Sequence, residues 1–139
     1  MRRRKEQKNG RWIRQIRFDS KGLVPAIIED AKTREVLMMA WMNREAVEKT
    51  LSTKKAHFYS RSRGKLWLKG ESSGHVQKVK RLALDCDGDT LLVSVDQKGG
   101  ACHAGYRSCF YRKLSPAKEW KAVGKKLFDP DKVYGKKSR

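Results

Sequence analysis

The sequence lacks any long apolar stretch, which argues against two classes of protein. No segment approaches the roughly 20 consecutive apolar residues that a membrane-spanning helix requires, and apolar residues make up only 38% of the 139 residues. The basic run at residues 2–5 is followed by no apolar segment, so it does not have the form of a secretory signal peptide. We therefore expect a cytoplasmic protein, and this length favours one compact domain.

Cysteine is also scarce, because the chain has only three. An odd number of cysteines cannot be paired completely within one molecule. Without a secretion signal, a disulfide scaffold is not expected. The three thiols are therefore available for another role.

Acidic residues are few, and the resulting positive charge is concentrated at the termini. The chain has 15 Asp and Glu against 34 Lys and Arg, a net charge of +19. Residues 1–14 hold seven basic residues and one acidic residue, and residues 113–139 hold nine and three. We interpret residues 1–14 as a basic flexible lead-in and residues 116–139 as a basic C-terminal tail, flanking a domain at residues 15–115. Basic arms attract polyanions, so a nucleic-acid partner is not favoured but stays open.

Hydrophobic patterning predicts a β-rich α+β domain with a mixed or antiparallel sheet and one or two short helices. Residues 24–28 and 36–42 are expected to form a hairpin, with Pro25 at an edge or a strand start. Asn43 is the expected N-cap of a helix ending near Ser52. Further strands are expected at residues 56–60, 66–68, 76–84 and 91–96, a last strand from Cys109, and a weak helix at residues 119–127.

Three carboxylates at alternate positions follow one of these strands. Asp85, Asp87 and Asp89 leave the strand end together and can converge on one hard cation such as Mg²⁺. The alternatives are a solvated turn, since Asp and Gly are common turn residues, and an EF-hand loop. Thr90 stands where an EF-hand loop requires glycine, which argues against the second alternative.

The three cysteines can form one metal site if the fold brings them together. Cys102 and Cys109 flank a glycine-rich loop, and Cys86 lies sixteen positions before Cys102. Three thiolates bind Zn²⁺ tightly and leave the fourth tetrahedral position open for water, as in catalytic zinc sites. The alternative is three ordinary buried cysteines, because the spacing matches no standard zinc finger.

A basic, glycine-containing segment at residues 59–75 is a candidate phosphate site. Arg61 and Arg63 offer guanidinium groups that bind phosphate in bidentate geometry, and Trp67 can stack on a base. The alternative is an exposed basic hairpin.

Six strings occur in one order along the chain. They are Tyr59-Ser60-Arg61-Ser62-Arg63, Leu66-Trp67 with Lys69-Gly70-Glu71, Ser73-Gly74-His75, Asp85-Cys86-Asp87-Gly88-Asp89, Ala101-Cys102-His103 and Gly105-Tyr106-Arg107-Ser108-Cys109-Phe110. Together they resemble the phosphoribosyl-AMP cyclohydrolase family over roughly residues 23–115. Ala104 and Phe58 depart from the pattern expected for that family, and neither departure removes a proposed ligand.

The resemblance implies two metals and a partner. It implies that Cys86, Cys102 and Cys109 bind Zn²⁺, with ligands drawn from two subunits of an intertwined homodimer. It also implies that Asp85, Asp87 and Asp89 bind Mg²⁺. No fused pyrophosphohydrolase domain is expected, so the protein should be monofunctional.

The resemblance further implies hydrolysis of the N1–C6 bond of phosphoribosyl-AMP, the third step of histidine biosynthesis. A histidine near the metal can transfer the proton as N1 leaves, and His103 is the first choice, followed by His75. The residues expected to bind the substrate are Arg61, Arg63, Trp67, Lys69, Ser73 and Arg107.

The rival hypothesis is a basic nucleic-acid-binding module with a structural zinc. It uses the same positive charge and the aromatic residues as stacking platforms. It leaves the three aspartates unexplained, because carboxylates repel phosphate unless a cation bridges them. The enzyme is the favoured hypothesis.

Overall fold

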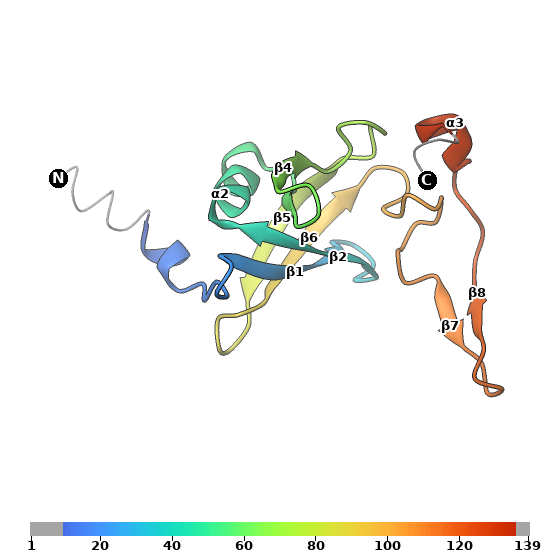
Figure 1. The fold of residues 1–139 in the computed structure, drawn as a ribbon, viewed down its shortest axis with the longest axis horizontal. Helices are drawn as coiled ribbons and strands as arrows, with labels where there is room; N and C mark the ends of the chain where they lie inside the picture. Colours follow the sequence, from blue (N-terminus) through green and yellow to red (C-terminus); the bar gives the residue numbers. More distant parts are fainter. Residues whose placement is uncertain (1–9, 136–139) are drawn as a thin grey trace.

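The central sheet joins two antiparallel strand pairs through one parallel contact. In the computed structural model, which describes residues 10–135, the sheet contains β1 (Leu23–Asp30), β2 (Val36–Asn43), β5 (Gln77–Leu84) and β6 (Leu91–Gln97). Their order is β2-β1-β6-β5. β1 pairs antiparallel with β2, β5 pairs antiparallel with β6, and β1 runs parallel to β6. The predicted mixed sheet and the β1–β2 hairpin are confirmed (Figure 1).

The core lies on one face of this sheet, beneath one helix. Val24, Ala26 and Ile28 alternate along β1 and are fully buried, as a strand with one buried face requires. α2 (Arg44–Thr53) buries Ala46 and Val47. The Asn43 side chain accepts the backbone N–H of Ala46 at 2.8 Å, so the predicted N-cap is confirmed.

A short hairpin lies next to β2 and completes the domain on the side of the helix. β3 (His57–Ser60) and β4 (Lys65–Leu68) pair antiparallel. Phe58 is fully buried and belongs to the core, whereas the turn at residues 61–64 is exposed. The buried Phe58 therefore fixes the hairpin to the core, while its basic turn is exposed to solvent.

Pro25 lies near the start of β1 and not in an edge strand, which agrees with the second of the two predicted positions. β1 is flanked by β2 on one side and β6 on the other. The register with β6 begins only at Ala26. Pro25 thus lies near the strand start, before the pairing with β6, where its missing N–H removes no bond to that strand.

The chain after residue 109 differs from the prediction. The last strands are β7 (Arg112–Leu114) and β8 (Trp120–Ala122), which form a hairpin apart from the central sheet (Figure 1). The backbone N–H of Cys109 donates to the carbonyl of Leu37 at 2.7 Å, so β7 starts only after that contact. The helix expected at residues 119–127 is absent there, and α3 (Pro130–Tyr134) follows instead.

The ordered domain begins before residue 15. Residues 10–14 are helical, and Ile13 and Ile16 are buried in the core. The prediction of flexibility for residues 1–9 lies outside the described residues, as do residues 136–139. Among residues 10–135, no helix is long and apolar enough to cross a membrane.

Candidate active site

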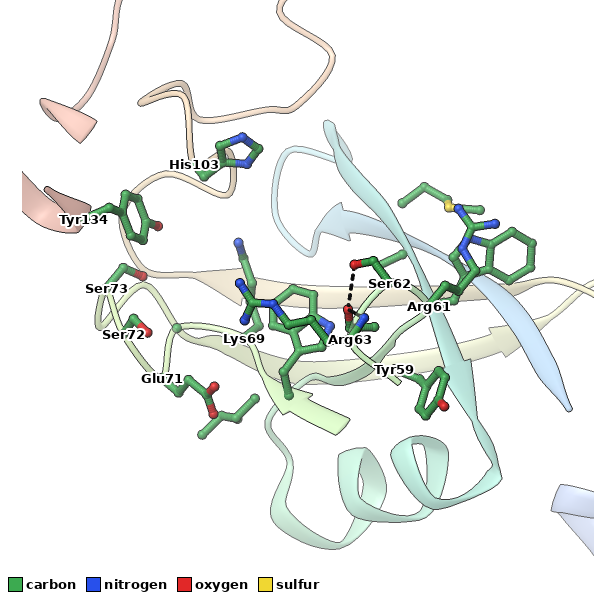
Figure 2. A pocket seen from close by; sticks show the side chains of 17 residues that line it. Tyr59, Arg61, Ser62, Arg63, Lys69, Glu71, Ser72, Ser73, His103 and Tyr134 are labelled. Carbon is green, nitrogen blue, oxygen red and sulfur yellow. Dashed lines mark hydrogen bonds between the residues drawn. The ribbon is translucent and has the colours of Figure 1, made fainter. Parts of the chain in front are cut away.

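A cleft of about 1060 Å³ opens between the β3–β4 hairpin, the loop before β5 and the loop after β6 (Figure 2). It gathers six of the predicted site residues from separate parts of the chain. These are Arg61, Arg63, Trp67, Lys69, Ser73 and His103. Met39, Ala40, Trp41, Tyr59, Ser60, Ser62, Leu68, Gly70, Glu71, Ser72 and Tyr134 complete the lining.

Aromatic rings hold the basic turn of the hairpin in place. The Arg61 guanidinium lies over the Trp41 ring, 4.8 Å from its centroid, which favours a cation–π contact. Trp67 packs on buried Phe58 with ring centroids 5.1 Å apart. Arg61, Arg63 and Trp67 therefore present cations and one aromatic face to the same cleft, a combination that suits a phosphorylated nucleotide.

Lys69 connects the cleft to the cysteine loop. Its side chain is buried, and Nζ donates to the carbonyl of Ala101 at 2.6 Å. Burial lowers the pKa of Lys69, and the nearby thiols of Cys109 and Cys102 oppose that shift. A buried ammonium so close to two thiols favours their ionised form.

The thiols of Cys102 and Cys109 lie close enough to interact with each other. The loop between them is closed by the Cys102 N–H, which donates to the carbonyl of Tyr106 at 3.1 Å, and by the Gly105 N–H, which donates to the carbonyl of Cys102 at 3.0 Å. A hydrogen bond from Cys109 lowers the pKa of Cys102 to about 6, while the same pairing raises the pKa of Cys109. Two neighbouring thiols, one of them with a lowered pKa, can supply two of the four ligands of a tetrahedral zinc site.

Cys86 lies at the opposite end of the sheet from this pair. It stands in the turn before β6, whereas Cys102 follows β6. β6 has seven residues, which at about 3.3 Å each span roughly 20 Å. Within one chain, then, the structure does not bring the three predicted zinc ligands together, and Cys86 is exposed.

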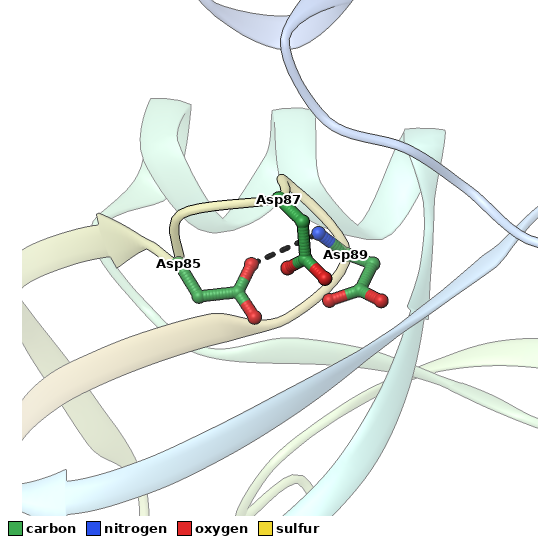
Figure 3. A group of neighbouring side chains, drawn as sticks. All are labelled: Asp85, Asp87 and Asp89. Carbon is green, nitrogen blue, oxygen red and sulfur yellow. Dashed lines mark hydrogen bonds between the residues drawn. The ribbon is translucent and has the colours of Figure 1, made fainter.

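The three aspartates do converge. One carboxylate oxygen from each of Asp85, Asp87 and Asp89 lies within 4.8 Å of the others (Figure 3). Asp85 Oδ1 accepts the backbone N–H groups of Asp89 and Thr90 at 3.0 and 3.2 Å. Hydrogen bonding with Asp87 and Asp85, together with their negative charge, raises the pKa of Asp89. A hard cation would relieve this crowding, so the donor set fits Mg²⁺.

The two predicted histidines have different surroundings. His103 is exposed and lines the cleft. His75 does not line it, because its ring packs against Gly99 and meets Phe128 with centroids 4.6 Å apart. Its Nδ1 is buried without a hydrogen-bond partner in the described part of the chain. Of the two, His103 has the better access to a bound substrate.

Arg107 also lies outside the cleft. Its guanidinium contacts the carboxylate of Asp30, and its Nε donates to Glu35 at 3.0 Å. These contacts tie the cysteine loop to the turn between β1 and β2. Arg107 therefore anchors the cysteine loop and does not line the cleft, where the substrate-binding prediction would place it.

Trp41, Glu71 and Tyr134 are among the lining residues that the sequence does not mark as site residues. Trp41 lies in the continuous apolar run at residues 36–42, which gives no sign that its side chain is only partly buried. Glu71 belongs to the Lys69-Gly70-Glu71 string, and its position in the sequence alone indicates no role. Tyr134 lies in the basic tail, where no pattern pointed to a site.

Comparison with known proteins gives the family of the chain. A family model described as Phosphoribosyl-AMP cyclohydrolase matches residues 38–111. Proteins named phosphoribosyl-AMP cyclohydrolase from Chlorobaculum parvum and Chlorobium limicola are each 58% identical over 127 residues, covering 91% of this chain and 93% of the relative. The protein of that name from Prosthecochloris aestuarii is 57% identical over the same shares. A match over more than half of the chain, with such identity over nearly all of it, shows that the chain belongs to the phosphoribosyl-AMP cyclohydrolase family.

Proposed function

We propose that this chain hydrolyses the N1–C6 bond of phosphoribosyl-AMP, in histidine biosynthesis, at a zinc site beside the cleft. The observation that carries the proposal is the shared position of Arg61, Arg63 and His103 around one cleft whose wall is bonded, through Lys69, to the cysteine loop. The arginines on one side of the cleft suit a phosphorylated substrate. The paired thiols behind the opposite wall suit a metal ion that activates water.

The residues of the cleft have different roles in substrate binding and proton transfer. Arg61 and Arg63 bind phosphate oxygens, and Trp67 supports the purine. The attack adds hydroxide to C6, the N1–C6 bond breaks, and C6 becomes a carboxamide while N1 stays on the ribose as a formimino nitrogen. His103 gives the proton that N1 needs as it leaves.

The donor set supports a zinc cofactor. Zn²⁺ held by thiolates lowers the pKa of bound water towards neutrality and so supplies hydroxide at neutral pH. Cys102 and Cys109 would hold the ion at the cleft, with Lys69 offsetting the negative charge of the thiolates. Asp85, Asp87 and Asp89 would hold Mg²⁺, the second proposed cofactor, which would supply positive charge for a substrate phosphate. These residues lie in the same turn as Cys86, at the other end of β6 from the cysteine loop, so that charge would serve a site to which a second copy contributes.

The third thiolate would come from a second copy of the chain. Cys86 is exposed and roughly 20 Å of strand away from Cys102. The β7–β8 hairpin extends from the domain with Leu114, Trp120 and Val123 exposed, Trp120 at 68%. Such apolar exposure on an extended hairpin favours a protein interface. An intertwined homodimer would cover this hairpin and bring Cys86 of one copy to Cys102 and Cys109 of the other.

The experiment follows ultraviolet absorbance while the protein is mixed with phosphoribosyl-AMP. Wild type and the exposed-turn control Lys32→Ala should produce the spectral change of ring opening, and Cys102→Ser should not. A chelator should abolish the change, and added zinc should restore it. Folded, zinc-replete protein that leaves the spectrum unchanged would contradict the proposal and revive the nucleic-acid hypothesis.

A further inference from the structure

The chain turns back after β8 and lies across the cysteine loop. The backbone N–H of Leu127 donates to the carbonyl of Gly105 at 2.7 Å. The next residue, Phe128, places its ring against His75, with centroids 4.6 Å apart and planes at 64°. A segment far along the sequence is therefore attached both to the loop of Cys102 and Cys109 and to the entrance of β5.

Two glycines make room for this attachment. A Cβ at Gly100 would lie 2.8 Å from Cε1 of Phe128. A Cβ at Gly105, where φ is +101°, would lie 2.6 Å from the carbonyl oxygen of Phe128. Any side chain at either position would force the segment away, so the loop and Phe128 fit each other closely.

From Phe128 the chain forms α3 and brings Tyr134 to the cleft. Asp129 caps the helix by accepting the backbone N–H of Asp131 at 3.0 Å, and Pro130 occupies its first turn. The rings of Phe128 and Tyr134 meet edge to face with centroids 6.2 Å apart. Tyr134 lines the cleft on the side of Ser73 and His103 (Figure 2).

We propose that Tyr134 is a substrate-contacting residue that forms the outer wall of the cleft, and that Phe128 is the positioning residue that places it there. The inference rests on the proposed function. Opposite Tyr134 the cleft offers cations and the Trp67 ring, so an aromatic wall encloses a nucleotide between two apolar faces. Both residues lie beyond residues 38–111, the part of the chain that the family model matches.

The test compares Tyr134→Ala, Tyr134→Phe, Phe128→Ala and the double variant in steady-state ring opening. Tyr134→Ala should raise KM about tenfold, equivalent to about 1.4 kcal/mol, with kcat changed much less, and Tyr134→Phe should keep most of the affinity because the ring remains. Phe128→Ala should raise KM similarly. The double variant should be no worse than Tyr134→Ala by more than about twofold, because both act through one contact.

Leu127→Ala is the matched control, since the Leu127 side chain is exposed and only its backbone N–H bonds to the loop. Titration with AMP, followed by tryptophan fluorescence from the cleft, reads binding without turnover and should weaken in the same variants. Wild-type KM and wild-type AMP affinity in folded Tyr134→Ala would overturn the inference. Additive losses in the double variant would overturn the positioning role of Phe128. If the wild type shows no ring opening but Tyr134→Ala still binds AMP more weakly than the wild type, the proposed reaction is contradicted. The contact between Tyr134 and the nucleotide would then still be supported.

Discussion

The guanidinium of Arg107 contacts the carboxylate of Asp30, joining the loop between the two neighbouring cysteines to the turn between β1 and β2. Asp30 also accepts the backbone N–H groups of Lys32 and Thr33 at 2.8 and 2.9 Å, so its carboxylate is itself fixed. The backbone carbonyl of Arg107 accepts the N–H of Ala101, next to Cys102. The geometry of the thiol pair therefore depends on a carboxylate far away in sequence.

Replacing Asp30 with Asn should loosen that loop and weaken zinc binding by about tenfold, a loss typical of changes to groups that support metal ligands. Asn keeps the oxygen that holds the turn but loses the charge that holds Arg107. Competition with a chromophoric chelator measures the zinc affinity. Glu35→Gln is the control, because Glu35 is the more exposed partner of Arg107 and should cost less. Equal losses in both variants would contradict this account.

The metal-free thiol pair should titrate in two well-separated steps. Cys102 should ionise at a pH of about 6, because Cys109 donates a hydrogen bond to its thiolate, and Cys109 should then resist ionisation. Thiolate absorbance against pH follows the low step in metal-free protein that carries Cys86→Ser, which removes the exposed third thiol from the signal. Cys109→Ser should shift the low step towards the ordinary thiol range. A single step at that ordinary range in wild type would show that the thiols do not interact.

Acid should destabilise the fold through Glu29. The Ser94 hydroxyl donates to its carboxylate at 2.6 Å, and this bond, opposed by burial and aided by Arg34, lowers the Glu29 pKa from 4.5. A carboxyl whose pKa is lowered by folding contributes stability above its unfolded pKa, and that stability is lost as the pH falls through the folded pKa. Urea unfolding at a series of pH values from neutral to well below 4.5 should show a shallower decline in Glu29→Gln than in wild type. Parallel declines would exclude Glu29 as a source of the pH dependence.

Two glycines of the cleft loop offer a matched pair of substitutions. Gly70 and Gly74 both have positive φ, +89° and +77°. A Cβ at Gly70 would also lie 2.6 Å from the backbone of His75 and Val76, whereas a Cβ at Gly74 would meet nothing within 4 Å. Gly74→Ala should therefore cost about 1 kcal/mol of unfolding free energy, and Gly70→Ala distinctly more. Thermal and urea unfolding measure the difference, and equal costs would contradict the close approach.

Most of the sheet could be predicted from the sequence because its signals are local. The alternation of Val24, Ala26 and Ile28, and the cap at Asn43, depend on residues close in sequence. The segment at residues 119–127 misled the prediction for the same reason. Its composition resembles a helix, but Trp120 pairs with Leu114 in a hairpin. Every residue of both strands is exposed, so no alternation of buried and exposed positions marks them as strands.

The site was predicted in part. Motifs marked Arg61, Arg63 and His103, and the structure places them in one cleft. No residue pattern could show that Arg107 is held by Asp30, since that pair is 77 positions apart. Tyr134 was missed because a basic tail gives no periodic signal, and its place follows from Phe128 packing on His75.

The central claim is that zinc-dependent ring opening takes place at a site shared by two chains. It is tested most directly by mixing Cys86→Ser with Cys102→Ser, each inactive alone, under conditions that exchange subunits. In a mixed dimer one site carries both substitutions and the other carries none. Since random exchange makes half of the dimers mixed, the account predicts recovery of about one quarter of wild-type activity. No recovery, with mixed dimers present by mass spectrometry, would contradict it.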